Sequence, residues 1–587
     1  MAKPVNDGTG VANSLGPSAT GGKLSAIARH SRGRRQFLQG SVAALSASAL
    51  PRVTSAAASL LPSGIEEIFS TLSLEEKIGQ LLMVGISGQE RTAETSAMLK
   101  ELKPGAIILL GRNVRDPAQL TTFAAALQEG ARVTRFVSMD QEGGTVVRLL
   151  RGATVFPGAM ATGATGSSGL ARLEGRVSGA ELSALGVNMN LAPVLDVNSN
   201  RKNPVIGVRA FGDDPMKVAM LSVAYALGLQ DSGVSAVAKH FPGHGDSVED
   251  SHRGLPTIKH DLARLQKVEL VPFAAAAKAG VDAMMTAHLL FPAIDDVPAT
   301  LSKKILTDIL RGQLGFQGMV ISDDLEMKAV EATIGVGPCT VRSILAGADQ
   351  VMIIWHRTNK DIARNALLAA VKSGELPMAR VDEAVRRVLS VKARRGIIPL
   401  PGTIPSFQKA DAAAIAAVGN PHHRRVAREI AKRAITLVWN RAGALPCTPA
   451  AAARLVVMSA SDDFLAEMRA VRPGSIEIHL PNKPDDAARG RVAALASRMA
   501  GRADRFVITV ANAEQALLAR AVADLLGMRV PVVGVALGAP YLLDDAERVA
   551  AHVCAYSSRP DSLRAVSRVV AGLDQAGGIA PVQLSAR

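Results

Sequence analysis

The chain is 587 residues long, which is more than one ordinary domain. Its residues are 48% hydrophobic and 20% charged, so the chain can build more than one buried core. After residue 60 no apolar run reaches the roughly 18 to 20 residues that a membrane span needs, so we expect a soluble mature protein without a membrane-spanning segment. The net charge of +15 does not predict a nucleic-acid partner, because the Lys and Arg residues are spread along the chain without interleaved aromatics.

The N-terminal segment accounts for part of that charge. Residues 1–57 hold seven Lys or Arg residues and one acid. The pair Arg34-Arg35 is followed by an apolar stretch, then by Pro51 and small residues up to Ala57. This order predicts a twin-arginine export signal, and hence a periplasmic or secreted protein, although a disordered basic tail is the alternative. The sequence leaves open whether the signal is cleaved.

From about residue 60, one pattern recurs eight times: a short apolar run, a turn, and then a longer stretch with helical spacing. Strands that alternate with helices pair in parallel, because a right-handed crossover needs a helix between neighbouring strands. Eight such units predict an α/β fold whose first domain is a closed (β/α)8 TIM-type barrel over residues 60–395. The predicted strands are 78–86, 106–111, 135–140, 187–193, 234–240, 282–288, 319–324 and 349–355.

A second, smaller domain follows a Pro/Gly-rich linker at 396–415. Residues 416–587 again alternate apolar runs with helical segments, which predicts an α/β sandwich with an open sheet. It contains neither a phosphate loop nor a GxGxxG motif, so we expect no nucleotide site in it. The predicted strands are 435–439, 455–460, 475–480, 506–511, 530–537 and 552–557.

Ionisable residues gather at the predicted strand ends, where barrel enzymes place their active sites. They are Asp140, Asp196, Lys239, His240, His288, Asp323 and Asp324, with Trp355 beside them. A carboxylate such as Asp323 at this rim can act as nucleophile, general base or metal ligand, and spacing alone excludes none of these. The segment from Ser138 to Arg148 adds an acid, a glycine pair and an arginine, groups that suit the hydroxyls of a sugar.

The segment Lys239–His252 is the most unusual stretch, with three histidines and three acids in fourteen positions. His240 and His244 have the spacing of zinc ligands, but the glycines and proline exclude a helix that would place both on one face. Asp250 and His252 offer another arrangement. In an extended loop, residues two apart point to the same side, so the carboxylate can bond one ring nitrogen while the other moves a proton near neutral pH.

Four motifs together resemble a known family. KHFPGHGDSVEDSH, SMDQEGGTVVR, NPVIGVRAFGDDP and VISDDLEM closely resemble glycoside hydrolase family 3, in particular its β-N-acetylglucosaminidase branch, over roughly residues 65–395. The second domain resembles the α/β sandwich that some members carry. The resemblance implies that Asp323 is a nucleophile that forms a covalent glycosyl-enzyme intermediate. It also implies that His252 is the acid/base, assisted by Asp250.

The resemblance further implies a set of residues that bind the N-acetylated sugar. They are Asp140, Arg148, Arg209, Lys239 and His240. Retention through a covalent intermediate usually employs two carboxylates, and here a histidine replaces one of them. An imidazole can be protonated to assist departure of the leaving group and neutral to activate water.

We therefore expect an exported, retaining exo-β-N-acetylglucosaminidase that acts on peptidoglycan fragments or chitin-type oligosaccharides and needs no metal or cofactor. A different family 3 β-glycosidase or a phosphorylase is the nearest alternative, because a neutral histidine repels phosphate less than a carboxylate does. A metallohydrolase and a non-catalytic sugar-binding protein are alternatives of other classes. The sequence predicts neither the natural leaving group nor the oligomeric state.

Overall fold

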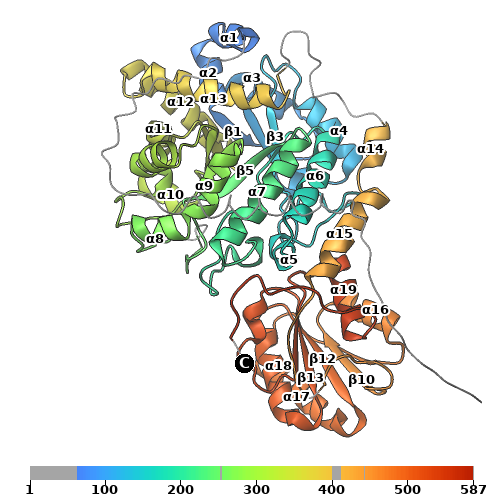
Figure 1. Cartoon of the computed structure of the whole chain (residues 1–587). Coiled ribbons are helices and arrows are strands. Elements are labelled where there is room, and N and C mark those ends of the chain that lie inside the picture. The colour runs from blue at the N-terminus through green and yellow to red at the C-terminus, as the bar shows by residue number, and fades with distance from the viewer. Residues whose placement is uncertain (1–62, 251–253, 399–411, 442, 586–587) are drawn as a thin grey trace, which may run out of the picture. The chain divides into compact units, whose positions relative to one another are not determined.

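A computed structural model of the chain describes residues 63–250, 254–398, 412–441 and 443–585, and one compact unit spans Leu60–Arg587. The predicted export signal and His252 lie outside the described residues. Eight parallel strands close into a barrel in chain order, with β8 pairing with β1, so the predicted barrel is confirmed (Figure 1). The strands are β1 (Leu82–Gly85), β2 (Ala106–Leu109), β3 (Phe136–Met139), β4 (Met189–Asn190), β5 (Ser235–Phe241), β6 (Ala283–Thr286), β7 (Met319–Asp324) and β8 (Gln350–Ile353).

Helices surround these strands and connect each to the next. They are α1 (Ser63–Ser70), α2 (Leu74–Gln80), α3 (Ala93–Leu102), α4 (Pro117–Ala126), α5 (Ala159–Ala164), α6 (Ser168–Ala184), α7 (Pro215–Asp231), α8 (Leu262–Lys267), α9 (Leu270–Ala279), the π-helix η4 (Lys304–Gln313), α10 (Lys328–Ile334), α11 (Val336–Ala346), α12 (Arg357–Ser373) and α13 (Met378–Arg394). The strong local signals for these helices are their capping residues. In α7, for example, the Asp214 side chain accepts from two backbone N–H groups, and Pro215 takes the first helical position.

The first predicted strand, 78–86, is too long at its start. A capping box between Ser73 and Glu76 begins helix α2, and this helix continues through Ile78 to Gln80 before β1 starts at Leu82. Both elements are buried here, so an apolar run cannot by itself separate the end of a buried helix from the start of a buried strand.

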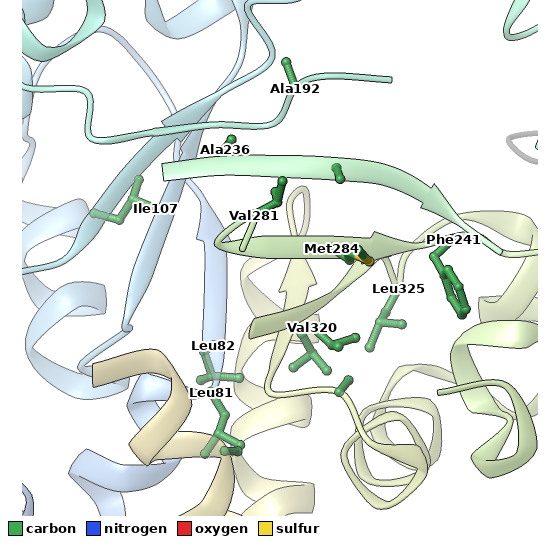
Figure 2. Close-up of a cluster of buried hydrophobic side chains, with 14 of the residues drawn as sticks. Leu81, Leu82, Ile107, Ala192, Ala236, Phe241, Val281, Met284, Val320 and Leu325 are labelled. Atoms are coloured by element: carbon green, nitrogen blue, oxygen red, sulfur yellow. The ribbon is translucent and has the colours of Figure 1, made fainter. Parts of the chain in front are cut away.

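The barrel core has two layers because side chains alternate along each strand. Met83 and Ile108 belong to the cluster inside the barrel, whereas their neighbours Leu82 and Ile107 pack outward against the helices. Figure 2 shows side chains of the outer layer, including Leu82, Ile107 and Val320 on β1, β2 and β7. Burying both faces explains why these strands read as continuous apolar runs.

The second domain contains a six-stranded sheet in the order β11-β10-β12-β13-β14-β9. Only β9 runs antiparallel to its neighbour, β14; the other described pairs are parallel. The strands are β9 (Thr436–Asn440), β10 (Leu455–Ser459), β11 (Ile476–His479), β12 (Arg505–Val510), β13 (Val532–Ala536) and β14 (Ala551–Cys554). The helices are α14 (Ala412–Ala417), α15 (Pro421–Ala434), α16 (Asp462–Val471), α17 (Asp486–Met499), α18 (Ala513–Leu526) and α19 (Pro560–Val570). All six predicted strands are present, and five of them agree with the prediction within two residues at each end. The sixth, predicted at 552–557, ends three residues earlier, at Cys554.

Two further features concern membrane spans and the cysteines. Among the described residues, no helix combines the length and the apolar character that crossing a bilayer would require. The three cysteines, Cys339, Cys447 and Cys554, are free thiols in buried positions.

Candidate active site

A cavity of about 500 Å³ lies at the carboxyl ends of the barrel strands, and its described lining residues all fall between Ile108 and Trp355. The structure brings six of the eight predicted site residues together in this lining: Asp140, Arg148, Arg209, Lys239, His240 and Asp323. Asp250 is described but does not line the cavity, and His252 lies outside the described residues. The predicted Asp250–His252 dyad therefore stays a prediction.

Lys239 is the centre of the polar cluster in this cavity. Its side chain is only 2% exposed and comes from the end of β5. The Nζ atom lies 2.8 Å from Oδ1 of Asp140 and 2.7 Å from Oε1 of Glu142. Burial opposes the charged form of Lys239, but the two carboxylates outweigh it and raise the pKa of the ammonium above its ordinary value.

Two arginines complete the cluster from other loops. Arg209 forms a bidentate pair with Glu142, at 2.9 Å from Nε and 2.8 Å from Nη2, and Arg148 Nη2 donates to Asp140 at 3.0 Å. Burial opposes ionisation of Asp140 and Glu142, yet the surrounding cations hold the pKa of both carboxyls below the ordinary value. These buried ion pairs thus fix the charges of the cluster relative to one another.

Behind His240 lies a second network, built on Asp196. Its Oδ2 atom lies 2.7 Å from Nδ1 of His240, and its Oδ1 accepts from the backbone N–H of His244 at 2.6 Å. Burial opposes ionisation of this carboxyl, but His240 and His244 hold its pKa below the ordinary value. Asp196 therefore sets the orientation of His240 and the path of the loop that follows.

His244 faces the nucleophile candidate. Burial lowers the pKa of its imidazole to about 4, although the charges of Asp196 and Asp323 act in the opposite sense. The ring is therefore neutral at pH 7. Ser247 Oγ lies 2.8 Å from its Nδ1 atom and fixes the ring further.

The two acids at the end of β7 have different environments. Asp323 is half-buried on the cavity wall, and its Oδ1 accepts from the backbone N–H of Asp324 at 2.8 Å. Burial raises the pKa of Asp324 to about 7, with a further contribution from the charges of Glu326 and Asp323. His288 is buried beneath them and bonds to the Asp324 carbonyl and to Thr300, so its contacts support the end of β7.

The rim of the cavity carries an exposed aromatic residue. Trp355 is 54% exposed, and the Arg112 guanidinium lies 4.4 Å from its ring centroid. Glu326 accepts from the backbone N–H groups of Trp355 and His356, at 2.5 and 2.9 Å. A carboxylate on the β7 side of the site thereby fixes the loop after β8, on which the tryptophan stands.

Two buried acids that organise the others, Glu142 and Asp196, received no catalytic or sugar-binding role from the sequence, although Asp196 was among the ionisable residues at the strand ends. Glu142 was visible in the DQEGG segment and Asp196 at the end of the fourth strand, but only their partners show their importance. For the metal alternative, the described residues hold no group of three His, Cys, Asp or Glu side chains arranged around an ion position.

Comparison with known proteins agrees with this geometry. Residues 73–391 match the N-terminal domain of glycosyl hydrolase family 3. The chain belongs to this family. It is 33% identical over 420 residues to beta-hexosaminidase A of Pseudoalteromonas piscicida, across 64% of this chain and 68% of that protein. It is 38% identical over 281 residues to a beta-hexosaminidase of Thiobacillus denitrificans, across 47% of this chain and 78% of the relative.

A solved structure extends the similarity through the second domain. The family 3 beta-N-acetylglucosaminidase from Paenibacillus sp. str. FPU-7 superposes with a TM-score of 0.79 at 35% sequence identity, covering 88% of this chain and 99% of that one. The resemblance seen in the sequence motifs is thus confirmed at the level of the family and the two-domain fold. The protein is a glycoside hydrolase.

Proposed function

We propose that this protein is a retaining exo-β-N-acetylglucosaminidase that removes terminal β-linked N-acetylglucosamine from peptidoglycan fragments or chitin-type oligosaccharides. The observation that carries the proposal is the position of Asp323, on the wall of a cavity that also contains the Asp140–Lys239–Glu142–Arg209 charge cluster. The names of the relatives, beta-hexosaminidase and beta-N-acetylglucosaminidase, support the choice of sugar.

In the proposed reaction, a carboxylate oxygen of Asp323 attacks the anomeric carbon and the bond to the leaving-group oxygen breaks. His252, held by Asp250, gives its proton to that oxygen. A water molecule then loses a proton to His252 and attacks the anomeric carbon, which releases Asp323 with net retention. Burial keeps the neighbouring imidazole of His244 neutral at pH 7, so this ring adds no positive charge beside the nucleophile.

The charge cluster is proposed to bind the sugar itself. Asp140, paired with Lys239 and Arg148, can accept hydrogen bonds from ring hydroxyls, while the two cations can donate to sugar oxygens. His240, oriented by Asp196, supplies a further ring nitrogen at the cavity wall. Trp355 is proposed to contact the leaving group, because it is exposed at the rim.

Export through the predicted twin-arginine signal would deliver the enzyme to the compartment that contains such polymers. Expression with and without residues 1–57, followed by fractionation, tests this part of the proposal. We expect the activity in the exported fraction only with the full chain, and an equal distribution for both forms would refute it.

The deciding experiment compares hydrolysis of chromogenic β-N-acetylglucosaminide and β-glucoside by the wild type, Asp323→Asn and His252→Ala. We expect cleavage of the acetamido sugar alone and a loss of at least 10³-fold in both variants. Preference for the glucoside, or full activity of His252→Ala, would show that the branch or the acid/base is wrong. Turnover that depends on inorganic phosphate would favour the phosphorylase alternative, and inhibition by a chelator would favour the metallohydrolase.

A further inference from the structure

A second cavity, of about 520 Å³, lies at the other end of the barrel. Gln80, Pro104 and Arg135 line it, and they immediately precede strands β1, β2 and β3, whereas the candidate active site follows the strands. We call it the basal cavity. Its described lining includes five cationic side chains and two glutamates, Arg91, Lys100, Lys103, Arg132, Arg135, Glu76 and Glu129. The lining therefore carries a formal excess of three positive charges.

The two glutamates do not neutralise the deepest cation of the basal cavity. Glu129 pairs with Arg91 at 2.5 Å, and Glu76 pairs with Arg132 at 2.9 Å and with Lys103 at 4.0 Å. Within the described part of the chain, no carboxylate pairs with Arg135. Lys100, exposed in the last turn of α3, likewise has no carboxylate partner among the described residues.

Arg135 is an unusual residue to leave without a counter-ion, because it is only 4% exposed. Its Nη1 donates to the carbonyl of Leu127 at 2.7 Å, but its buried Nε has no hydrogen-bond partner. Burial, and next the charge of Arg91, lowers the pKa of this guanidinium to about 10, so it stays charged at neutral pH. A desolvated charge of this kind is costly unless an anion offsets it.

A second buried base lies just behind the cavity wall. The Nζ of Lys392, on α13, donates to Gln80 Oε1 at 2.8 Å, and Gln80 itself lines the cavity. Burial, followed by the charge of Arg135, holds the pKa of Lys392 well below its ordinary value. An anion at Arg135 would favour the protonated form of this lysine through the same electrostatic coupling.

We propose that the basal cavity binds a small organic anion, whose phosphate or carboxylate head contacts Arg135 and Lys100. Leu72, Leu99 and Val133 add apolar surface for a short body next to that head. A planar guanidinium suits either head group, because both offer two oxygens for paired N–H donors. This site is separate from the proposed hydrolytic site, so it stands or falls independently of the proposed function.

The test is thermal unfolding of the full chain with inorganic phosphate or citrate, against sodium chloride at the same ionic strength. We expect a saturable rise in Tm of roughly 3–4 °C at a hundredfold excess over Kd, with no such rise in chloride. A response to phosphate alone indicates a phosphate head, and a response to citrate alone indicates a carboxylate. A rise no larger than that in chloride would overturn the proposal.

Two variants and a matched control locate the response. Lys100→Gln removes one charge at the basal cavity, and we expect about tenfold weaker binding by calorimetry. Lys372→Gln is the control, because Lys372 is also exposed in the last turn of its helix, α12, and is in no described ion pair. Arg135→Met should abolish binding without lowering Tm in chloride, because it removes a buried charge that lacks a counter-ion. Equal affinity in Lys100→Gln and Lys372→Gln would overturn the assignment even if Arg135→Met does not fold.

Discussion

Glu142 is the residue whose replacement tests the site most directly. The side chain is 6% exposed and holds Lys239, which is 2% exposed, and Arg209, which is 16% exposed. Glu142→Gln keeps the size and shape of the side chain but removes its charge. Among the described residues, Lys239 then keeps Asp140 as its one carboxylate partner. Arg209 faces a neutral amide with one acceptor oxygen instead of two.

The expected loss of stability follows from the burial of the partners. Breaking a buried ion pair from one side costs about 3–5 kcal/mol, because it leaves an uncompensated charge. Asp140 remains 2.8 Å from the ammonium of Lys239, so we expect the lower end, about 3 kcal/mol, or roughly 4 °C in Tm for a barrel of this size. The value of kcat/KM should fall about a hundredfold, because the sugar-binding cations lose their fixed positions.

Calorimetry and hydrolysis of the chromogenic N-acetylglucosaminide measure the two effects. Glu129→Gln is the matched control: Glu129 also pairs with an arginine, but it is 69% exposed, so its loss should cost less than about 1 kcal/mol. Because the pKa of Glu142 is lowered in the fold, its contribution is present above its ordinary pKa of 4.5 and is lost as the pH falls below that value. An unchanged Tm in Glu142→Gln at pH 7 would refute the reasoning.

Three further changes have distinct expected outcomes. As pH rises from about 4 to about 7, Asp324→Asn should gain stability over the wild type by up to about 4 kcal/mol, because the unfolded chain ionises Asp324 over this range while burial keeps the folded carboxyl neutral. Denaturation at pH 4 and pH 8 measures the stability difference between variant and wild type, and equal differences at both pH values would contradict this expectation. Trp355→Ala should lower kcat/KM about tenfold for an N-acetylglucosamine disaccharide but little for a small aryl glycoside. Equal losses of kcat/KM for the two substrates would place the indole outside the leaving-group position. Asp349→Asn should destabilise the fold by about 3–5 kcal/mol with KM unchanged, because the buried Asp349 carboxylate pairs with Arg311 and Arg380. An unaltered Tm would show that these ion pairs contribute nothing to stability.

The barrel could be predicted from the sequence because its signal is local and repeated. Each strand is a short apolar run, and the runs at 135–140, 234–240 and 319–324 end in polar residues. Asp140, Lys239 and Asp323 could therefore be placed at strand ends without coordinates. The boundary between α2 and β1 could not, since both elements are buried around Gln80 and share the same apolar pattern.

By itself, the sequence determined the order of strands and helices, the family motifs and the residues that could carry the chemistry. Only the tertiary structure decided which charges meet. Lys239 lies 99 positions from Asp140, and Arg209 lies 67 positions from Glu142, so no local pattern could pair them. The same holds for the basal cavity, where Arg135 is one cation among many in the sequence and is distinguished only by its burial without a carboxylate partner in the described chain. Closing the barrel brings distant strand ends within a few ångströms, and the desolvation that accompanies closure decides which pairs matter.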